Sequence, residues 1–371
     1  MAEAEAGSGT ERTGKRWLRI ALALVLLSLA ASCMACSPVY VAKATFAEVR
    51  ILRARRPIPQ VITDSTTSQD IRDKLAWVLE ARRFAADELG IDVGDSYTMF
   101  TQLERDTLML VVSAAPKDQL SPVTWWFPIV GRVPYRGFFD DEDAFEAEAD
   151  LREDGYDTYV RPTAAFSTLG WFNDPVLSTT LRTDDVEIVT TVLHELAHRY
   201  LFVPGQVGFN ESFANFVGRV AAIRFFCTRE GSGPDSVKCL RAQARWRDTK
   251  RFSVFIDDFA AELDRLYYES GLPYEEKVER REPIFDDARE RFQTEVQPTL
   301  ESLTFSSFVT TPMNNATLMG RIRYYHRLPG FQALLDEHDG DLVALLEDLK
   351  RRLPDADDPF DLLPSGASAV Q

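Results

Sequence analysis

The sequence predicts an α+β fold in which a small mixed sheet lies over a helix that carries a histidine pair, followed by a mainly helical C-terminal part. Strand-like segments rich in β-branched and aromatic residues occupy roughly 107–172. From Asp184 onward, apolar residues recur at helical spacing with only short interruptions. The 371 residues, 45% of them hydrophobic, are enough for a packed core.

The first 36 residues are typical of a signal peptide. Basic residues precede an apolar run from Ile20 to Ala31, and small residues then lead to Cys33 and Cys36. Either cysteine resembles the lipidation site of a bacterial lipoprotein. An uncleaved membrane anchor is the alternative. Both interpretations place the body of the protein in the bacterial cell envelope, tethered to a membrane and facing the periplasm, with inner and outer membrane both open.

Charge and cysteine content limit the partners and the compartment. The net charge is -16, and a nucleic-acid-binding domain needs a basic face, so no nucleic-acid partner is expected. Cys227 and Cys239 flank a polar loop, where an oxidising compartment permits a disulfide. Two unpaired thiols are the alternative. No partner protein can be named from the sequence.

The elements before the histidine pair follow from periodicity and stop signals. Helices are expected at 46–56, 68–90 and 142–155, because prolines follow the first and glycines end the other two. Strands are expected at about 107–115, 123–139 and 157–172. The segment 173–182 is expected to be a loop.

The histidine helix and its successor have clear boundaries. Asp184 and Glu187 form a D-x-x-E start signal of the capping-box type. Pro204 and Gly205 end that helix, and a second helix is expected from near Asn210 to Phe226.

The expected domain organisation has three parts. An export and anchor region covers 1–36. One catalytic-type domain covers 37–353, with a core at about 160–226 and a helical part at 227–353. A disordered tail, acidic and rich in proline and serine, covers 354–371.

The segment "HELAH" carries the chemistry. His194 and His198 are four residues apart and share one helix face, so both imidazoles can bind one metal ion. Glu195 can then act as general base on a metal-bound water. Glu211, 13 residues after His198, is the candidate third ligand, which would leave one position open for water on a single Zn²⁺. For Glu211 the alternatives are a helix-capping acid and a hydrogen-bond partner of a histidine.

The blocks "HELAHRYLFVPGQVGFNESFANFVG", "AFSTLGWFNDPVLST" and "NNATLMGRIRYYH" resemble the putative aminopeptidase family of bacterial envelope proteins. The resemblance extends from about Cys36 to Leu353. It implies a zincin-like, gluzincin-type zinc metalloprotease with His194, His198 and Glu211 as ligands and Glu195 as base. The interval before Glu211 is shorter than in better-known gluzincins.

The resemblance also suggests residues that contact a peptide substrate. The strand expected at Thr163–Phe172 would pair with the peptide through Ser167, Leu169 and Gly170, and Asp174 would bind the free amine. An ordinary sheet strand and a turn residue are the alternatives.

This enzyme type commonly uses tyrosine or histidine as the donor to the oxyanion. We select Tyr325 from the neighbouring candidates Tyr324, Tyr325 and His326, with packing of a core helix as the alternative for each.

Several functions fit this sequence. The first is a zinc-dependent hydrolase that acts as an aminopeptidase. An endopeptidase or an amidase with the same site, and a metal-binding envelope lipoprotein without turnover, are the alternatives. The presence of Glu195 counts against the last of these, because a protein without turnover has no use for the base.

Overall fold

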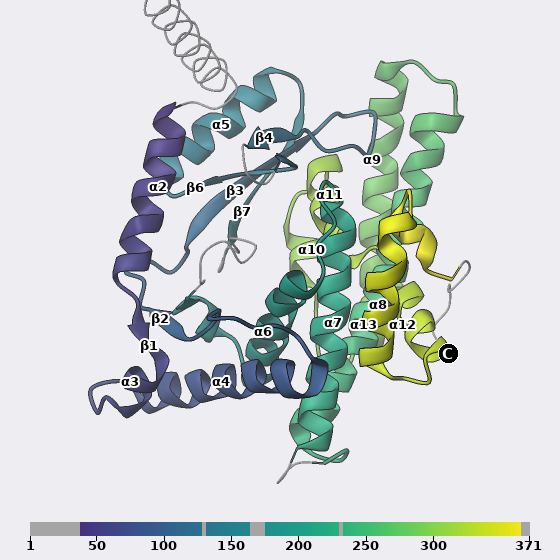
Figure 1. The fold of residues 1–371 in the computed structure, drawn as a ribbon. Coiled ribbons are helices and arrows are strands. Elements are labelled where there is room, and N and C mark those ends of the chain that lie inside the picture. The colour runs from purple at the N-terminus through teal and green to yellow at the C-terminus, as the bar shows by residue number, and fades with distance from the viewer. Residues whose placement is uncertain (1–37, 128–130, 164–174, 230–232, 365–371) are drawn as a thin grey trace, which may run out of the picture.

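The computed structural model describes residues 38–127, 131–163, 175–229 and 233–364 (Figure 1). Helices dominate this part of the chain, and short strands form small sheets beside them. The predicted α+β class is therefore confirmed.

The helices fall into two groups along the chain. Those of the first group are α2 (Pro38–Arg53), α3 (Ile58–Thr63), α4 (Gln69–Leu89), α5 (Asp141–Glu153), α6 (Asp185–Tyr200) and α7 (Val207–Thr228). Those of the second group are α8 (Val237–Asp264), α9 (Tyr274–Arg291), α10 (Ser306–Thr310), α11 (Asn315–Tyr325), α12 (Leu328–Glu337) and α13 (Leu342–Arg352). Short 3-10 and π turns join them: η1 (Thr180–Arg182), η2 (Arg265–Glu269), η3 (Phe292–Val296), η4 (Gln297–Thr299), η5 (Leu353–Asp355) and η6 (Pro359–Leu362).

The strands are short and form three sheets within the described residues. They are β1 (Arg56–Pro57), β2 (Met99–Thr101), β3 (Met109–Ala115), β4 (Trp125–Phe127), β5 (Gly131–Val133), β6 (Arg136–Phe138), β7 (Asp157–Thr163) and β8 (Val176–Leu177). The largest sheet is antiparallel, with the order β6-β3-β7. A small mixed sheet has the order β1-β2-β8, and β4 pairs with β5.

Helix boundaries follow the capping signals of the sequence. Ser68 accepts a hydrogen bond from the backbone N–H of Ile71 at the start of α4, and Gly90, with φ of +65°, ends it. Asp184 caps α6 by accepting from the N–H of Glu187 at 3.1 Å. The predicted boundaries of α4 and the predicted start of α6 are confirmed, but α6 ends at Tyr200, before Pro204 and Gly205.

The antiparallel sheet lies between α5 and α11 (Figure 1). Val112 and Val160 pack toward α5, in a cluster with Ala144. The ring of Tyr159, next along β7, lies against Gly320 of α11. Arg161, two residues further, contacts Tyr324 of the same helix. Because side chains alternate along a strand, β7 directs Tyr159 and Arg161 toward α11.

The expected sheet directly over the histidine helix is not what the described residues form. There α6 packs mainly on α4 and α7, and the antiparallel sheet contacts α11 instead. The β-strand expected at Thr163–Phe172 falls largely on residues outside the described ranges. Helix α11 is therefore the element that links the antiparallel sheet to the histidine helix α6.

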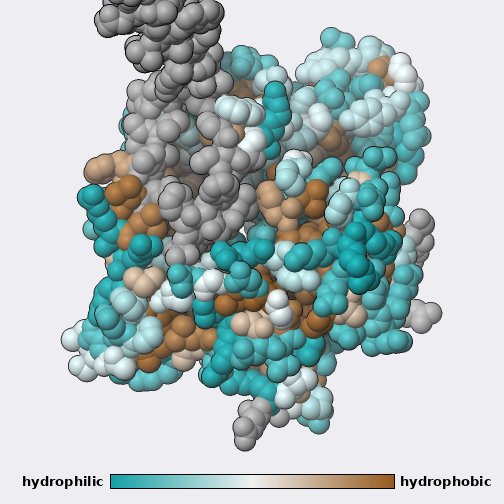
Figure 2. Space-filling model, viewed as in Figure 1, coloured by the Kyte–Doolittle hydropathy of each residue, from teal (hydrophilic) through white to brown (hydrophobic). Residues whose placement is uncertain are grey.

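Two apolar clusters hold the molecule together. One unites α3, α4, α6, α7, the first half of α8, α12 and α13. The other is rich in aromatic rings and unites α8, α9, α10 and α11. On the face shown in Figure 2, hydrophilic residues cover much of the described surface, and hydrophobic residues form patches between them.

Cys227 and Cys239 form a disulfide that joins the last turn of α7 to the first turn of α8. The alternative of two unpaired thiols is therefore wrong. The N-terminal region with Cys33 and Cys36 lies outside the described residues. Within the described ranges, every helix is too short or too polar to cross a bilayer.

The tail was expected to be disordered from residue 354, and for residues 354–364 this is wrong. The chain there forms η6 after η5, and the side chain of Leu363 is 3% exposed. Phe360 packs on Phe209 of α7, and Arg327 donates a hydrogen bond to the carbonyl of Phe360 at 2.8 Å. A few apolar side chains are enough to order this acidic segment, because each of them buries apolar surface against the core.

Candidate metal centre

Three potential metal ligands converge where α6 meets α7. His194 and His198 lie one turn apart on α6, and Glu211 comes from α7. The Oε2 atom of Glu211 is 3.4 Å from the Nε2 atom of His194 and 3.6 Å from that of His198. All three ligand atoms lie within 4.8 Å of one another.

This donor set fits a zinc ion. Atoms that bind one zinc at about 2.0–2.2 Å lie roughly 3–4 Å apart, and the measured nitrogen–oxygen distances agree with this. Two imidazoles and one carboxylate are a ligand set of catalytic zinc sites, which keep a fourth position open.

The charges of the three groups depend on one another. Burial raises the pKa of Glu211, but the attraction of His198 and hydrogen bonds from both histidines outweigh it, so its pKa is well below the usual range. Burial lowers the pKa of His198, and the negative charge of Glu211 more than compensates, so the net shift is upward. A carboxylate that stays ionised here is suited to bind a cation.

Glu195 lies beside the cluster with one oxygen unpaired. Its Oε2 atom is buried and has no hydrogen-bond partner, and the same holds for the Nδ1 atom of His198. Burying a carboxylate oxygen without a partner is costly. That cost is consistent with a proton-accepting role toward a water molecule at the centre.

The polar residues around Glu211 position the ligand helix. Asn210 accepts from the N–H of Val203 at 2.9 Å and donates to its carbonyl at 2.8 Å, which pins the turn between α6 and α7. Ser212 donates to the carbonyl of Arg323 at 3.2 Å, and Asn215 to that of Tyr324 at 2.7 Å. The last turn of α11 is thereby held on α7.

The start of α7 differs from the prediction. The helix begins at Val207, not near Asn210, so Glu211 lies beyond the first turn and does not cap the helix. Phe209 is fully buried and favours the earlier start. Of the two alternatives to a ligand role, capping is therefore wrong.

Close packing of α6 on α7 depends on Gly218. A Cβ atom added there would lie 2.8 Å from the carbonyl oxygen of Thr190 and 3.0 Å from the Cβ of His194. Such distances are shorter than van der Waals contact, so only glycine allows this approach. Gly218 therefore sets the separation of α6 and α7 directly beside His194, a potential metal ligand.

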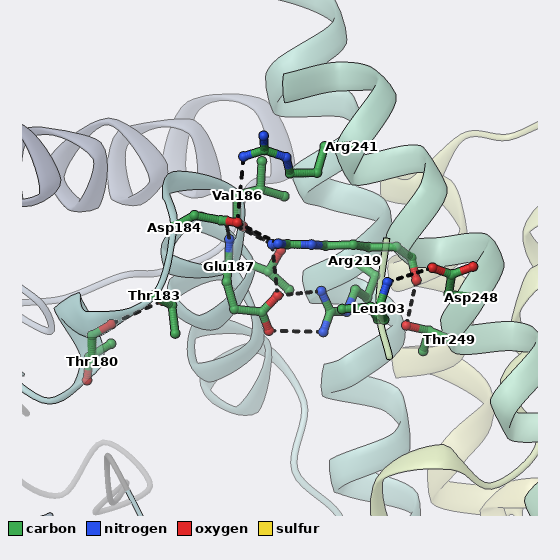
Figure 3. A network of polar contacts seen from close by, with 12 residues as sticks. Thr180, Thr183, Asp184, Val186, Glu187, Arg219, Arg241, Asp248, Thr249 and Leu303 are labelled. Carbon is green, nitrogen blue, oxygen red and sulfur yellow. Dashed lines mark hydrogen bonds and ion pairs between the residues drawn. The ribbon is translucent and has the colours of Figure 1, made fainter. Parts of the chain in front are cut away.

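A partly buried ion-pair network supports the same helices from α8 (Figure 3). Arg219 of α7 donates to both carboxylate oxygens of Glu187 on α6, at 2.8 and 3.0 Å. Arg245 of α8 donates to Asp184 at 2.8 Å and to Glu187 at 3.4 Å. Burial raises the pKa of Glu187, but Arg219 outweighs it and the net shift is downward. The network stays charged and ties three helices together.

Tyr324, rather than the selected Tyr325, lies at the metal centre. Its ring stacks on that of His194 with centroids 6.5 Å apart. Burial raises the pKa of Tyr324, and the charge of Glu211 adds to the rise. Tyr325 packs instead against Phe252 and Phe305 in the aromatic cluster, so Tyr324 and not the selected Tyr325 is the tyrosine beside His194. The role of oxyanion donor itself stays a prediction.

His326, the third candidate, is also accounted for elsewhere. Its Nδ1 atom is 2.6 Å from Asp257, and its ring packs on Phe360. These contacts place His326 against the C-terminal tail and α8.

Three residues at the site were not found from the sequence. Tyr135, Arg161 and Arg323 surround Tyr324. Arg161 donates to the Tyr324 hydroxyl at 3.4 Å, and the Arg323 guanidinium lies 5.1 Å from the centroid of the Tyr135 ring. Their only signal in the sequence was that polar residues occur on a strand, in a turn and on a helix, and such a pattern carries no distance to the proposed metal site.

The candidate substrate residues Ser167, Leu169, Gly170 and Asp174 lie outside the described residues. Their roles therefore stay predictions.

Comparison with known proteins gives one match. A family model described as "Putative aminopeptidase" matches residues 39–358. Neither the curated proteins nor the solved structures yielded a match. The matched range contains the three potential metal ligands, Glu195, Tyr324 and the three residues around Tyr324. Since it covers most of the chain, the protein belongs to the putative aminopeptidase family.

Proposed function

We propose that this protein is a peptidase that holds one zinc ion with His194, His198 and Glu211 and removes residues from the N-termini of peptides. The observation that carries the proposal is the convergence of these ligand atoms within 4.8 Å beside an unpaired oxygen of Glu195. Membership of the putative aminopeptidase family supports the choice of reaction.

The residues of the site divide the chemistry between them. A bound zinc would polarise a carbonyl and lower the pKa of water toward neutrality. Glu195 accepts the proton of the attacking water and donates it to the leaving amine. Tyr324 donates a hydrogen bond from its hydroxyl to the oxygen of the scissile carbonyl. Arg161 donates to the phenol oxygen, which leaves that proton available for the substrate.

The test compares the full chain, purified in mild detergent with zinc, with its Glu195→Gln variant. Each protein is incubated with a diverse peptide pool, with free or acetylated N-termini, and products are read by mass spectrometry. We expect single residues to be lost from free peptides only. Glu195→Gln should lower the rate by about 10²-fold or more while it retains zinc, measured by elemental analysis.

Other outcomes select other functions. Cleavage of the acetylated peptides inside the chain would indicate an endopeptidase. Equal absence of products from both proteins, with zinc bound in both, would contradict the peptidase proposal and favour an amidase or a non-catalytic lipoprotein.

We propose further that the protein is a lipoprotein facing the periplasm. Its N-terminal pattern and the Cys227–Cys239 disulfide support an oxidising compartment outside the cytoplasm. Intact mass of the mature protein from a bacterial host should show a lipid on Cys33 or Cys36, lost in the matching Cys→Ser variant. A mature chain that keeps its unmodified N-terminus would contradict this proposal.

A further inference from the structure

Two arginines beside the proposed metal centre, Arg161 partly buried and Arg323 buried, have no carboxylate partner among the described residues. Arg161 comes from β7 and Arg323 from α11, and Arg323 is 5% exposed. The only side-chain hydrogen bond of Arg161 in the described part of the chain goes to Tyr324. The Nη1 atom of Arg323 is buried and has no hydrogen-bond partner.

The other arginines that are buried in the described residues each donate side-chain hydrogen bonds to oxygens of the protein, although the Nε atom of Arg219 also lacks a partner. Arg219 donates to both oxygens of Glu187, and Arg281 to both oxygens of Asp157, at 2.7 and 3.0 Å. Arg321, two residues before Arg323 on the same helix, donates to two backbone carbonyls. Because a buried cation without a paired anion is costly, the different state of Arg161 and Arg323 requires an explanation.

The positions of Arg161 and Arg323 suggest an explanation for their lack of an anionic partner. Arg161 lies over the ring of Tyr324 at 5.8 Å and Arg323 over that of Tyr135 at 5.1 Å. Tyr324 in turn stacks on His194. Burial raises the pKa of Tyr135, the charge of Glu211 adds to the rise, and Arg323 and Arg161 oppose it. Both arginines and both tyrosines therefore share the electrostatic surroundings of the ligand Glu211.

We propose that Arg161 and Arg323 bind a carboxylate of the substrate immediately after the scissile bond. Guanidinium groups match carboxylates in geometry and charge. The inference rests on the proposed peptidase function and names its substrate class: peptides whose residue after the scissile bond carries an anionic group. That group is either the terminal carboxylate of a dipeptide or an acidic side chain.

Because the whole protein is strongly acidic, attraction of an anionic group must come from the two arginines at the site itself. A net charge of -16 disfavours an anionic substrate at a distance. Two cations in a buried site reverse that preference at short range, where screening is weak. A dipeptide with a free carboxylate would satisfy the unpaired Nη1 atom that the protein leaves buried.

The test measures binding rather than turnover. Zinc-loaded Glu195→Gln protein is titrated calorimetrically with Leu-Gly, Leu-Gly-amide, Leu-Glu-amide and Leu-Gln-amide. If the terminal carboxylate is recognised, Leu-Gly binds about tenfold or more tightly than its amide. If an acidic side chain is recognised, Leu-Glu-amide exceeds Leu-Gln-amide by the same factor.

Variants locate the effect. Arg323→Met and Arg161→Met, each added to Glu195→Gln, should remove most of the preference, and Arg323→Lys should keep part of it. Arg321→Met, the matched control on the same helix, should leave the preference unchanged. The comparison of four ligands on one protein needs none of these variants, so a variant that fails to fold does not decide the matter.

The outcomes separate this inference from the proposed function. Equal binding within both pairs, Leu-Gly with its amide and Leu-Glu-amide with Leu-Gln-amide, or no binding of any of the four, overturns the inference. If the wild type nevertheless cleaves free peptides, the peptidase function stands without it. A carboxylate preference in a protein that cleaves no peptide would support the anion site and contradict the peptidase.

Discussion

At the scale of single residues, the segment from Asn210 to Asn215 shows how one short stretch builds most of the site. Glu211 provides the proposed metal ligand, Asn210 fixes the turn before it, and Ser212 and Asn215 hold the last turn of α11. Ligand and tyrosine therefore keep their relative position because both depend on the same helix. An apolar substitution of Ser212 or Asn215 would therefore disturb both α7 and α11.

Tyr324 and Tyr325 make a matched pair for a test. Tyr324→Phe should lower kcat by about 10²–10³-fold with little change in KM, because the lost hydroxyl acts on the transition state. Tyr325→Phe should keep kcat within a fewfold of wild type. Steady-state kinetics on a free peptide would check both. A larger loss with Tyr325→Phe would contradict the assignment.

The sequence predicted the histidines and glutamates but not the tyrosine. Spacing along one helix determines which residues share a face, so His194 and His198 can be paired from the sequence. Adjacent residues on a helix point about 100° apart, so one of Tyr324 and Tyr325 faces the site and the other the core. Only the packing of α11 on α7 decides which.

At the scale of elements, α7 is the helix on which the site depends. It carries Glu211, packs on α6 through Gly218 and pairs with α6 through Arg219. Its far end is joined to α8 by a disulfide. The distance between ligand helices is consequently constrained at several points along their length.

Gly218→Ala should destabilise the fold and weaken zinc binding. The added methyl group would meet Thr190 and His194 at about the distances of a clash, and overpacking of this kind costs about 1–3 kcal/mol in the free energy of unfolding. Denaturant unfolding and zinc competition with a chelator would measure the two effects.

Gly208→Ala on the same helix is the control. A Cβ there meets nothing within 4 Å, and alanine favours the helix by roughly 0.5–1 kcal/mol. Stability should therefore stay equal or rise. Equal behaviour of the two variants would contradict the role given to Gly218.

Helix boundaries were predictable where capping residues mark them, as Asp184 does for α6. The start of α7 was not, because Gln206 makes no side-chain cap hydrogen bond. The antiparallel sheet was predicted as strands, but its place against α11 depends on long-range pairing of β3 with β6 and β7. Local patterns do not encode such contacts.

At the scale of the whole molecule, the C-terminal segment closes the first apolar cluster. Phe360 and Leu363 belong to it together with residues of α7 and α12. Composition alone predicted disorder from residue 354, because the segment is acidic and rich in proline and serine. The average composition of the segment does not show that its few apolar side chains can be buried against the core.

Phe360→Ala should lower the free energy of unfolding by about 2 kcal/mol, less than for a fully buried phenylalanine because the ring is only half-buried. Phe145→Ala, whose ring is 54% exposed, should change it by less than about 0.5 kcal/mol. Thermal or denaturant unfolding would compare them. Similar losses in both variants would mean that the tail contributes no specific packing.

The clamp of α7 on α11 also restricts how this protein can diverge. Arg323 and Tyr324 are neighbours in one helical turn, and their carbonyls are held by Ser212 and Asn215. An inherited change that shifts this turn to accept a new ligand also displaces the tyrosine beside His194. Descendants with altered preference would therefore arise more readily through Tyr135 or Arg161, which the sheet and its turns carry, than through α11.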